Sequence, residues 1–594
     1  MSREAGDSID RVELRWPGKR GPGEHVGPGL AIEVEQRIGG VGDDFEPARN
    51  LLICADNLLA MDALLATHAG AVDLIYLDPP FATGHDFVRT SFTGEGEARG
   101  ELRTHAYHDR WPGGLAGFLR MLEPRLRLCH RLLAPHGSLY LHVDPTVGHY
   151  AKLVLDEIFG ADCFQREIVW RIGWLSGFKT RAHNWIRNHD LLFFYTKDPA
   201  RFTFNKQYVP HPEGYLRRDG QPARGKGVPM EDVWNANVAE FALRGRDSLD
   251  SIQIKSFSRE KTGWATQKNQ SLLRRIIAAS SKPGDLVADF FCGSGTTMVA
   301  AAELGRRFLG CDCAAPAIEL AHTRLCEAVP EDRSDIRFDR CGLGLPERRA
   351  WLGQGGQAGH VSQLLRHCGA RPAQAPGLHG IREQTAIWVG PWDGPVTRDH
   401  VREAVTATTR HGLTSLDIIG WSWAFGADED LSAGTGVALT CLQARRALLD
   451  ERAREGTALG ERPAFTLEWL TGDPHTVTVA LRGATLRRPE RLDPPLRAAL
   501  ADWRELVEAW SIDFDATSST MHPTQRWHRT RARPVLDLHS APHTYPDAAP
   551  RRVRVELLDR LGAAYSLRFQ LTWLNGQLEV APRHEQQGAA APPA

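Results

Sequence analysis

The residues with the clearest chemical potential lie in the stretch YLDPPF, where Asp78 is followed by Pro79, Pro80 and Phe81. Two prolines cannot donate ladder hydrogen bonds, so the backbone leaves a strand here in an extended form with free carbonyl groups. A carboxylate beside a carbonyl oxygen offers two acceptors, which suits an amino group with two N–H donors. The ring of Phe81 can stack on the aromatic ring that carries the amine. The tetrapeptide therefore predicts a binding site for an exocyclic amine.

A second motif, DLVADFFCGSGTT, ends a strand at Asp289 and turns through Gly293 and Gly295 into a helix that begins near Thr296. Glycines in such a turn let the backbone pass close to a ligand. The third glycine of the dinucleotide fingerprint is missing, and no lysine of a phosphate-binding loop follows. These absences favour a nucleoside ligand without a pyrophosphate, and S-adenosylmethionine is the candidate.

An acid, Asp312, ends the next strand pattern, RRFLGCD. Cofactor-binding α/β folds place a carboxylate at this position to accept hydrogen bonds from ribose hydroxyl groups. Together with Phe291 and Asp289 at their spacings, Asp312 strengthens the prediction of a cofactor loop.

Strand and helix patterns alternate through the part of the chain that carries both motifs. This alternation predicts an α/β fold with a mostly parallel, doubly wound, Rossmann-like sheet covered on both faces. Composition then divides the rest of the chain. We expect an irregular N-terminal arm (1–45), the sheet domain (46–340), a linker (341–380), a C-terminal mainly β domain (381–580) and a disordered tail (581–594).

The formal net charge of -1 hides a local excess of basic residues. Between Arg166 and Arg275 there are 20 Lys and Arg against 11 Asp and Glu, an excess of 9. An inserted basic region (about 166–265) of this kind, interleaved with aromatic residues, predicts a face for a polyanion such as DNA. A solvated basic surface without a ligand is the simpler alternative.

The composition excludes several other classes of protein. Ten scattered cysteines form no disulfide framework, and no second pair accompanies Cys311 and Cys313 at zinc-ligand spacing, so we expect no metal site. The charged N-terminus is no secretory signal, and no run of 18 apolar residues could cross a membrane. We therefore expect a cytoplasmic protein.

The ordered set of motifs resembles a known family. DPPF followed about two hundred residues later by DFFCGSGTT is similar to the amino-methyltransferases of the β permutation group. The segments LRWPGK, NLLICADNLLAM, LLAPHGSLYLHVD, NHDLLFFYTKD and TQKNQSLLRRIIAASSKPGD resemble the modification subunits of restriction-modification systems. The resemblance covers roughly residues 13 to 330.

The resemblance implies roles for individual residues. The tetrapeptide implied to be catalytic is Asp78, Pro79, Pro80 and Phe81. The residues implied to bind S-adenosylmethionine are Asp289, Phe291, Gly293, Gly295, Thr296, Asp312, Thr266, Lys268 and Asp56. The chain departs from the family pattern at Asn269, where a proline is usual, and at Ala55, where a glycine is usual. Neither departure removes an atom that the chemistry needs.

The implied activity is methyl transfer from S-adenosylmethionine to the exocyclic N6 of adenine in double-stranded DNA, at a specific site, within a restriction-modification or phage-defence system. Two alternatives remain open. Cytosine N4 presents a similar amine, although serine in place of Asp78 is more usual in that group. A non-catalytic DNA-recognition or scaffold subunit is the other alternative. A restriction or helicase partner and a homodimer are further expectations.

Overall fold

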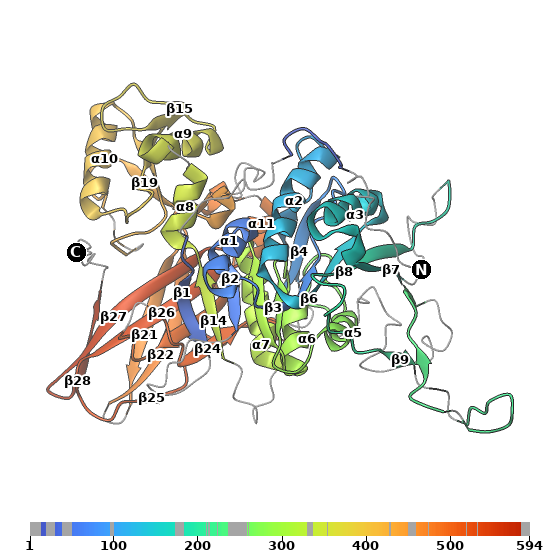
Figure 1. Cartoon of the computed structure of the whole chain (residues 1–594). Coiled ribbons are helices and arrows are strands. Elements are labelled where there is room, and N and C mark those ends of the chain that lie inside the picture. Colours follow the sequence, from blue (N-terminus) through green and yellow to red (C-terminus); the bar gives the residue numbers. More distant parts are fainter. Residues whose placement is uncertain are drawn as a thin grey trace, which may run out of the picture. The chain divides into compact units, whose positions relative to one another are not determined.

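The computed structural model describes residues 13–19, 30–38, 50–94, 100–172, 183–209, 211, 214–222, 224–235, 258, 260–328, 337–352, 355–426, 429, 431–449, 459–472, 475–492, 494–517, 520–530 and 533–583. The chain folds into two compact units (Figure 1). Unit 1 comprises Met1–Ile32, Gly39–Phe87 and Ala106–Gly342, and unit 2 comprises Glu33–Ile38, Val88–His105 and Leu343–Ala594.

Unit 1 is built on a mixed sheet with strand order β14-β2-β13-β12-β3-β6-β8-β7-β11. The strands are β2 (Leu51–Cys54), β3 (Val72–Leu77), β6 (Leu133–Val143), β7 (Phe164–Arg171), β8 (His189–Thr196), β11 (Val233–Trp234), β12 (Leu286–Asp289), β13 (Arg307–Asp312) and β14 (Phe338–Gly342). Neighbouring strands run parallel except β8, which is antiparallel to both β6 and β7. The prediction of a mostly parallel sheet is confirmed.

Helices lie on both faces of this sheet. They are α1 (Asn57–His68), α2 (Leu115–Leu132), α3 (Pro145–Phe159), α5 (Gln270–Ser280), α6 (Thr296–Glu303) and α7 (Ala315–Ala328). Figure 1 places α1, α2 and α3 together on one face and α5, α6 and α7 together on the other. Because both faces are covered, the central strands are mostly apolar, and all four residues of β12 are buried. The doubly wound arrangement predicted from the sequence is confirmed.

The strand order explains how distant motifs meet. Strand β12 pairs with β3 on one side and with β13 on the other, and β2 pairs with β13. Parallel neighbours present their carboxyl ends at the same edge. The residues that follow β3 and end β12 and β13, which are Asp78, Asp289 and Asp312, therefore gather at one edge of the sheet.

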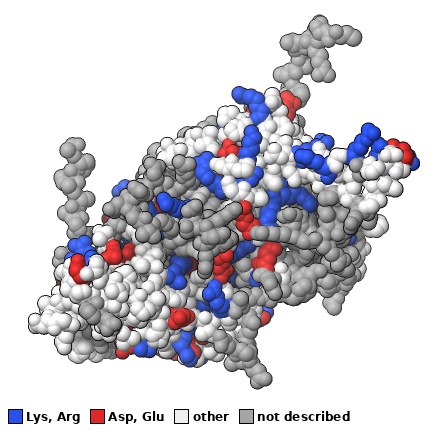
Figure 2. All heavy atoms as spheres, turned by 90° about the horizontal axis from the view of Figure 1, so that it is seen from below, with Lys and Arg blue, Asp and Glu red and all other residues white. Residues whose placement is uncertain are grey.

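The inserted region predicted at about 166–265 contributes β7, β8 and β11 to the sheet and a separate arm. In the arm, β9 (Tyr208–Val209) pairs antiparallel with β10 (Val228–Pro229). The arm extends away from the sheet (Figure 1), and several of its basic residues are exposed. On the face drawn in Figure 2, Lys and Arg side chains form several clusters with acidic side chains between them. Residues 173–182 and 236–257 of the insertion lie outside the described part of the chain.

A hairpin connects the two units along the chain. It consists of β4 (Asp86–Thr93) and β5 (Gly100–His108). The outer part of the hairpin, Val88–His105, belongs to unit 2, whereas its base belongs to unit 1. The boundary predicted for the sheet domain, 46–340, did not foresee that a segment inside it would be part of another unit.

The first half of unit 2 is an α/β structure. Its sheet has the order β15-β16-β17-β18-β19-β20. The strands are β15 (Arg371–Pro372), β16 (Gly380–Arg382), β17 (Thr385–Val389), β18 (Ser415–Gly420), β19 (Ala438–Ala444) and β20 (Leu459–Glu461), and the helices are α8 (Gly344–Leu352), α9 (Gly356–His367) and α10 (Arg398–Arg410). Since α8 and α9 fall within 341–380, the prediction of a linker there is wrong: buried Leu364 and Leu365 of α9 pack into a core with Ile387.

The second half of unit 2 is mainly β, as predicted, whereas the first part of the predicted range 381–580 is the α/β structure that contains α10. Two sheets, β21-β22-β25 and β24-β23-β26-β27-β28, share one apolar core. The strands are β21 (Ala464–Thr471), β22 (Thr476–Thr485), β23 (Val507–Asp513), β24 (Gln525–His528), β25 (His543–Thr544), β26 (Arg551–Asp559), β27 (Ala564–Leu574) and β28 (Gln577–Pro582). A short helix, α11 (Pro494–Ala499), also belongs to unit 2. Strand β1 (Glu33–Ile38) comes from the N-terminal segment 1–45, which was predicted to be irregular. The predicted tail lies outside the described residues from 584 onward.

A buried cluster of ion pairs holds the outer part of the hairpin within unit 2. The guanidinium of Arg89 donates to one carboxylate oxygen of Glu508, and Arg560 Nε donates to the other at 3.2 Å. Arg560 also donates to Glu505 at 2.9 Å and to the carbonyl of Phe92 at 2.6 Å. Burial alone would raise the pKa of Glu508, but Arg89 and Arg560 lower it to about 2.

Candidate active site

Asp78 follows β3 directly, and its two carboxylate oxygens differ in environment. Oδ2 accepts a hydrogen bond from Lys268 Nζ at 2.5 Å. Oδ1 is buried and has no hydrogen-bond partner among the described residues. Lys268 Nζ also lies 5.2 Å from the centre of the Phe81 ring. The predicted acid and aromatic ring are thus brought together, with one oxygen still able to accept a hydrogen bond.

A buried hydrogen-bonded chain lies beside Phe81. The ring of His142, on β6, is 5.9 Å from the Phe81 ring. His142 Nδ1 is 2.8 Å from the Tyr76 hydroxyl, and His142 Nε2 is 3.2 Å from Asp190 Oδ2. Burial would raise the pKa of Asp190, but the hydrogen bond from His142 and the nearby positive charges lower it to about 2. This chain fixes the wall against which Phe81 lies, and nothing in the sequence motif indicated it.

The glycine loop is organised by Asp289, the last residue of β12. Its Oδ1 accepts from the Phe291 N–H at 2.9 Å, and its Oδ2 accepts from the Thr297 hydroxyl at 2.6 Å. Burial, together with the charges of Asp78 and Asp312, raises the pKa of Asp289 to about 7. The carboxyl group therefore shapes the turn rather than facing solvent.

Both predicted glycines adopt left-handed backbone conformations. Gly293 has φ +48° and Gly295 has φ +75°. A Cβ atom on Gly295 would lie 2.5 Å from the Cβ atom of Ala321 on α7, and one on Gly293 would lie 3.1 Å from Trp264 Nε1. The glycines thus satisfy packing as well as the turn, and the loop leads into α6 at Thr296.

Asp312, the last residue of the neighbouring strand β13, binds the loop through its carboxylate. Its Oδ2 accepts from the Gly293 N–H at 2.9 Å, and its Oδ1 accepts from the Ala314 N–H at 2.8 Å. A carboxylate oxygen can accept more than one hydrogen bond, so these contacts leave room for a ligand hydroxyl. The predicted position of this acid beside the glycine turn agrees with the geometry of the described residues.

Asp56 has a structural role in the described contacts. Its carboxylate caps α1 by accepting from Leu58 N–H at 2.8 Å and pairs with Arg125 at 3.2 Å. Its side chain is 44% exposed. The neighbouring Asn57 donates to the Phe290 carbonyl at 2.7 Å, which ties the start of α1 to the end of β12. A cofactor contact for Asp56 stays a prediction.

The segment that carries Thr266 and Lys268 packs beside the hairpin base. The Thr266 hydroxyl lies 2.9 Å from the Tyr107 hydroxyl, and Thr266 itself has φ +58°. Tyr107 stacks on Phe87 with ring centres 4.8 Å apart, and both contact a small apolar cluster that includes buried Trp264. The two predicted residues therefore face different neighbours: Thr266 faces Tyr107, and Lys268 faces Asp78.

Two further residues shape the site without any signal in the motifs. Asp109 accepts hydrogen bonds from the N–H groups of Ala82 and Thr83, at 2.8 and 2.9 Å, and so fixes the chain after Phe81. Arg324 on α7 donates to the Ser294 carbonyl at 2.8 Å, and burial lowers its pKa to about 10. Both residues are distant in sequence from the segments they hold, so only the fold reveals them.

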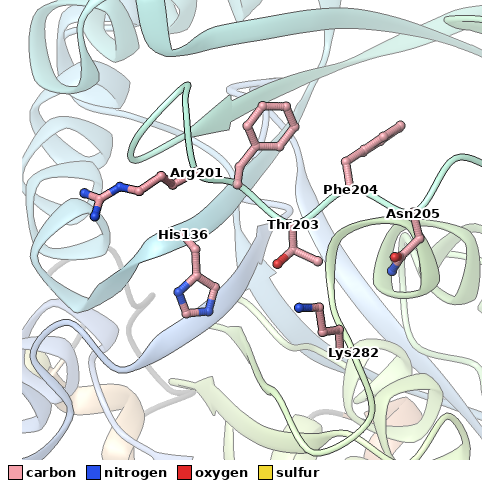
Figure 3. A pocket seen from close by; sticks show the side chains of 7 residues that line it. His136, Arg201, Thr203, Phe204, Asn205 and Lys282 are labelled. Atoms are coloured by element: carbon pink, nitrogen blue, oxygen red, sulfur yellow. The ribbon is translucent and has the colours of Figure 1, made fainter.

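A second hollow of about 440 Å³ lies at the opposite, amino-terminal edge of the sheet. In Figure 3 the side chains of His136, Thr203 and Lys282 point into the same space, whereas Arg201 points away. His136 pairs with Asp73 at 2.8 Å, and Arg201 pairs with Asp198 at 2.6 Å. Its location at the amino-terminal edge separates this hollow from the candidate active site.

The described residues contain no group of three or more His, Cys, Asp or Glu side chains that could hold a metal ion. None of the helices in that part of the chain is long and apolar enough to cross a membrane.

The acids and the glycine turn at the carboxyl edge of an open α/β sheet define a ligand-binding site of the nucleoside-cofactor type. Residues 72–323 match the protein family described as DNA methylase.

Individual proteins are similar to parts of this chain. The type II methyltransferase M.HpaI of Haemophilus parainfluenzae is 29% identical over 291 residues, which cover 49% of this chain and 79% of that protein. The DNA adenine methyltransferase YhdJ of Escherichia coli (strain K12) is 29% identical over 275 residues, covering 45% of this chain and 80% of that protein. The M1.HpyAVI–SAM complex is a similar solved structure, with a TM-score of 0.30 and 19% identity over 46% of this chain and 98% of that chain.

Proposed function

We propose that this protein transfers a methyl group from S-adenosylmethionine to the exocyclic N6 of adenine at a specific sequence in double-stranded DNA. The observation that carries the proposal is that Asp78 and the glycine loop follow the ends of two neighbouring strands, since β3 and β12 pair directly. The Asp78 carboxylate keeps one oxygen without a hydrogen-bond partner among the described residues. One relative, named as a DNA adenine methyltransferase, supports the choice of base.

The proposed chemistry at the target base depends on Asp78. Its carboxylate and the Pro79 carbonyl would accept the two N–H groups of the adenine amine. These bonds favour a pyramidal nitrogen whose lone pair points at the methyl group. Since pairing hides the amine inside a duplex, the base is flipped out at a cost of a few kcal/mol, which stacking on Phe81 offsets. Holding both reactants in line accounts for much of the rate.

The cofactor would occupy the loop between β12 and α6. Asp312 would accept bonds from the ribose hydroxyls, and the half-buried ring of Phe291 would contact the adenine moiety. Because Gly293 has a positive φ and its N–H is fixed by Asp312, this part of the loop is pre-organised for a close approach by a ligand. When bound, S-adenosylmethionine supplies a methyl group already activated by a sulfonium leaving group.

DNA contacts would come from the arm around β9 and β10. Its exposed basic residues include Lys206, Arg218, Arg224 and Lys226. Exposed Tyr215 stacks on His211 with ring centres 4.9 Å apart. Positive side chains beside aromatic rings suit a phosphate backbone, which supplies most of the affinity of such proteins for DNA.

A restriction partner is a further part of this proposal. One relative, 22% identical over 410 residues, is named as a probable type III restriction-modification Mod subunit of Haemophilus influenzae. This chain covers 52% of that protein. Purification from the native host would identify a restriction or helicase subunit by mass spectrometry.

The proposal is tested with labelled methyl donor and mixed-sequence duplex DNA, followed by digestion and separation of nucleosides. We expect label in N6-methyladenine with the wild type and none with Asp78→Ala. Asp399→Asn is the matched control, because Asp399 is an exposed residue of α10. Label in N4-methylcytosine would replace adenine by cytosine as the target. Absence of label on any DNA would contradict the proposed activity.

A further inference from the structure

Lys268 holds a cation at the point where the target amine is expected. Its ammonium donates to Asp78 Oδ2 and lies 5.2 Å from the centre of the Phe81 ring. The two side chains of this pair are only 12% and 16% exposed. An adenine amine in the proposed reaction needs the same two neighbours, a carboxylate that accepts its N–H groups and an aromatic ring beside it.

Neither oxygen of Asp78 is accessible in this arrangement. Lys268 occupies Oδ2, and Oδ1 is buried beneath neighbouring atoms without a partner among the described residues. A base that enters the site therefore cannot reach the carboxylate until a side chain moves. Lys268 is the group that directly blocks it.

We propose that Lys268 is a displaceable substitute for the target amine. In the base-free protein it neutralises Asp78, and it withdraws when the flipped base delivers its own N–H donors. This inference rests on the proposed function, and it assigns to Lys268 a role at the target base rather than at the cofactor. Lys268 is a positioning residue in this scheme, since it leaves before the methyl group moves.

The structure indicates which part of Lys268 can move. Side-chain hydrogen bonds hold the residues on both sides of it: Gln267 Oε1 accepts from Thr262 N–H at 2.9 Å, and Asn269 Oδ1 caps α5 by accepting from Leu272 N–H at 3.0 Å. Motion is thus confined to the flexible four-carbon side chain. Asp190 is a second carboxylate within reach of its charge, because Lys268 contributes to the low pKa of Asp190.

Two variants, measured beside the wild type, separate this role from its alternatives. Kinetics are measured with one unmethylated duplex that carries the target site, at several salt concentrations, for wild type, Lys268→Met and Lys268→Arg. Removing the substitute should lower the KM for DNA about fivefold, the equivalent of roughly 1 kcal/mol for one ion pair. Lys268→Arg should raise KM, because a guanidinium pairs bidentately with a carboxylate. The salt dependence of KM should not change.

Other outcomes overturn the inference. If Lys268 contacted a phosphate, Lys268→Met would raise KM and reduce the salt slope by about one. Lys226→Met, on the exposed arm, is the control that should give that phosphate pattern. If Lys268 held Asp78 throughout the reaction, Lys268→Met would lower kcat at unchanged KM.

Two controls distinguish a folding defect from a change in function. Should Lys268→Met fail to fold, Lys268→Gln keeps one amide donor for Asp78, and its KM should lie between the values for complete removal and wild type. A wild-type protein that methylates no DNA contradicts the proposed function and this inference with it. If the wild-type protein methylates DNA but the KM values of the variants fall in the reverse order, only the role of Lys268 is contradicted.

Discussion

Two groups of buried carboxylates in this molecule differ in how completely they are paired. In unit 2, both oxygens of Glu508 are bound by arginines, and its pKa is lowered to about 2. In unit 1, Asp289 has no arginine partner in its described contacts and its pKa is raised to about 7, while one oxygen of Asp78 has no partner among the described residues. The fully paired Glu508 contributes to stability, whereas Asp78 keeps acceptor capacity that a ligand can use once Lys268 moves.

The largest expected effect concerns Asp78. Asp78→Ala should reduce methyl transfer at least about 10³-fold, which corresponds to about 4 kcal/mol in the barrier, because the amine loses its acceptor. The melting temperature should hardly change, since the carboxylate is only partly paired. Single-turnover transfer and thermal unfolding are measured on the same preparation. A large loss of stability would place Asp78 in the same class as Glu508.

The second effect concerns Glu508. Glu508→Gln should lower the free energy of unfolding by about 3 kcal/mol, because Arg89 would remain buried without its counter-charge and Arg560 would keep only Glu505. Denaturant unfolding followed by circular dichroism measures this loss. Glu579→Gln, on the exposed strand β28, is the matched control and should change stability little. Equal stability of the two variants would show that the cluster contributes nothing net.

Acid titration sharpens the same contrast. The pKa of Glu508 lies at about 2 in the folded protein, below its ordinary value of 4.5. A lowered pKa contributes stability that is present above pH 4.5 and is lost as the pH falls toward 2, here about 3 kcal/mol. Unfolding measured between pH 2 and 5 should show this dependence in wild type and lose it in Glu508→Gln.

Asp289 should give a pH dependence of stability with the opposite sign. Its pKa is about 7 when folded against an ordinary 3.8, so the favourable contribution is present below pH 3.8 and is lost as the pH rises to 7. The stability of Asp289→Asn relative to wild type should therefore improve by about 2 kcal/mol or more between pH 4 and pH 8. Thermal unfolding of the two proteins at both pH values measures it. A constant difference would show that Asp289 ionises normally.

The smallest effect concerns Asp56. Asp56→Ala should cost about 1 kcal/mol of stability through loss of the α1 cap, whereas Asp56→Asn should retain most of it. Methyl transfer should follow the folded fraction in both variants. If Asp56→Ala weakened S-adenosylmethionine binding, as titration calorimetry would detect, the predicted cofactor role of Asp56 would be supported.

The sequence predicted the parts of the site that depend on strand ends. Asp78, Asp289 and Asp312 each close an apolar strand pattern, and a parallel sheet brings such ends together. Arg324 and Asp109 could not be predicted, because they act on segments far away in the sequence. In unit 2, the stretch near Trp503 and Trp510 has apolar residues at helical spacing, yet it forms a short 3-10 turn and the strand β23. Every residue of β23 is buried, so no alternation marked it as a strand.

The β4–β5 hairpin has a consequence for how the gene can be divided. Unit 2 takes Glu33–Ile38 and Val88–His105 from the first part of the chain and the remainder from beyond Leu343. Truncation after Gly342 would therefore remove Glu508, the acidic partner of Arg89, but leave Arg89 itself behind. The same interleaving means that a single recombination event cannot exchange either unit for a homologous one. The two units are inherited as one piece, although each has its own core.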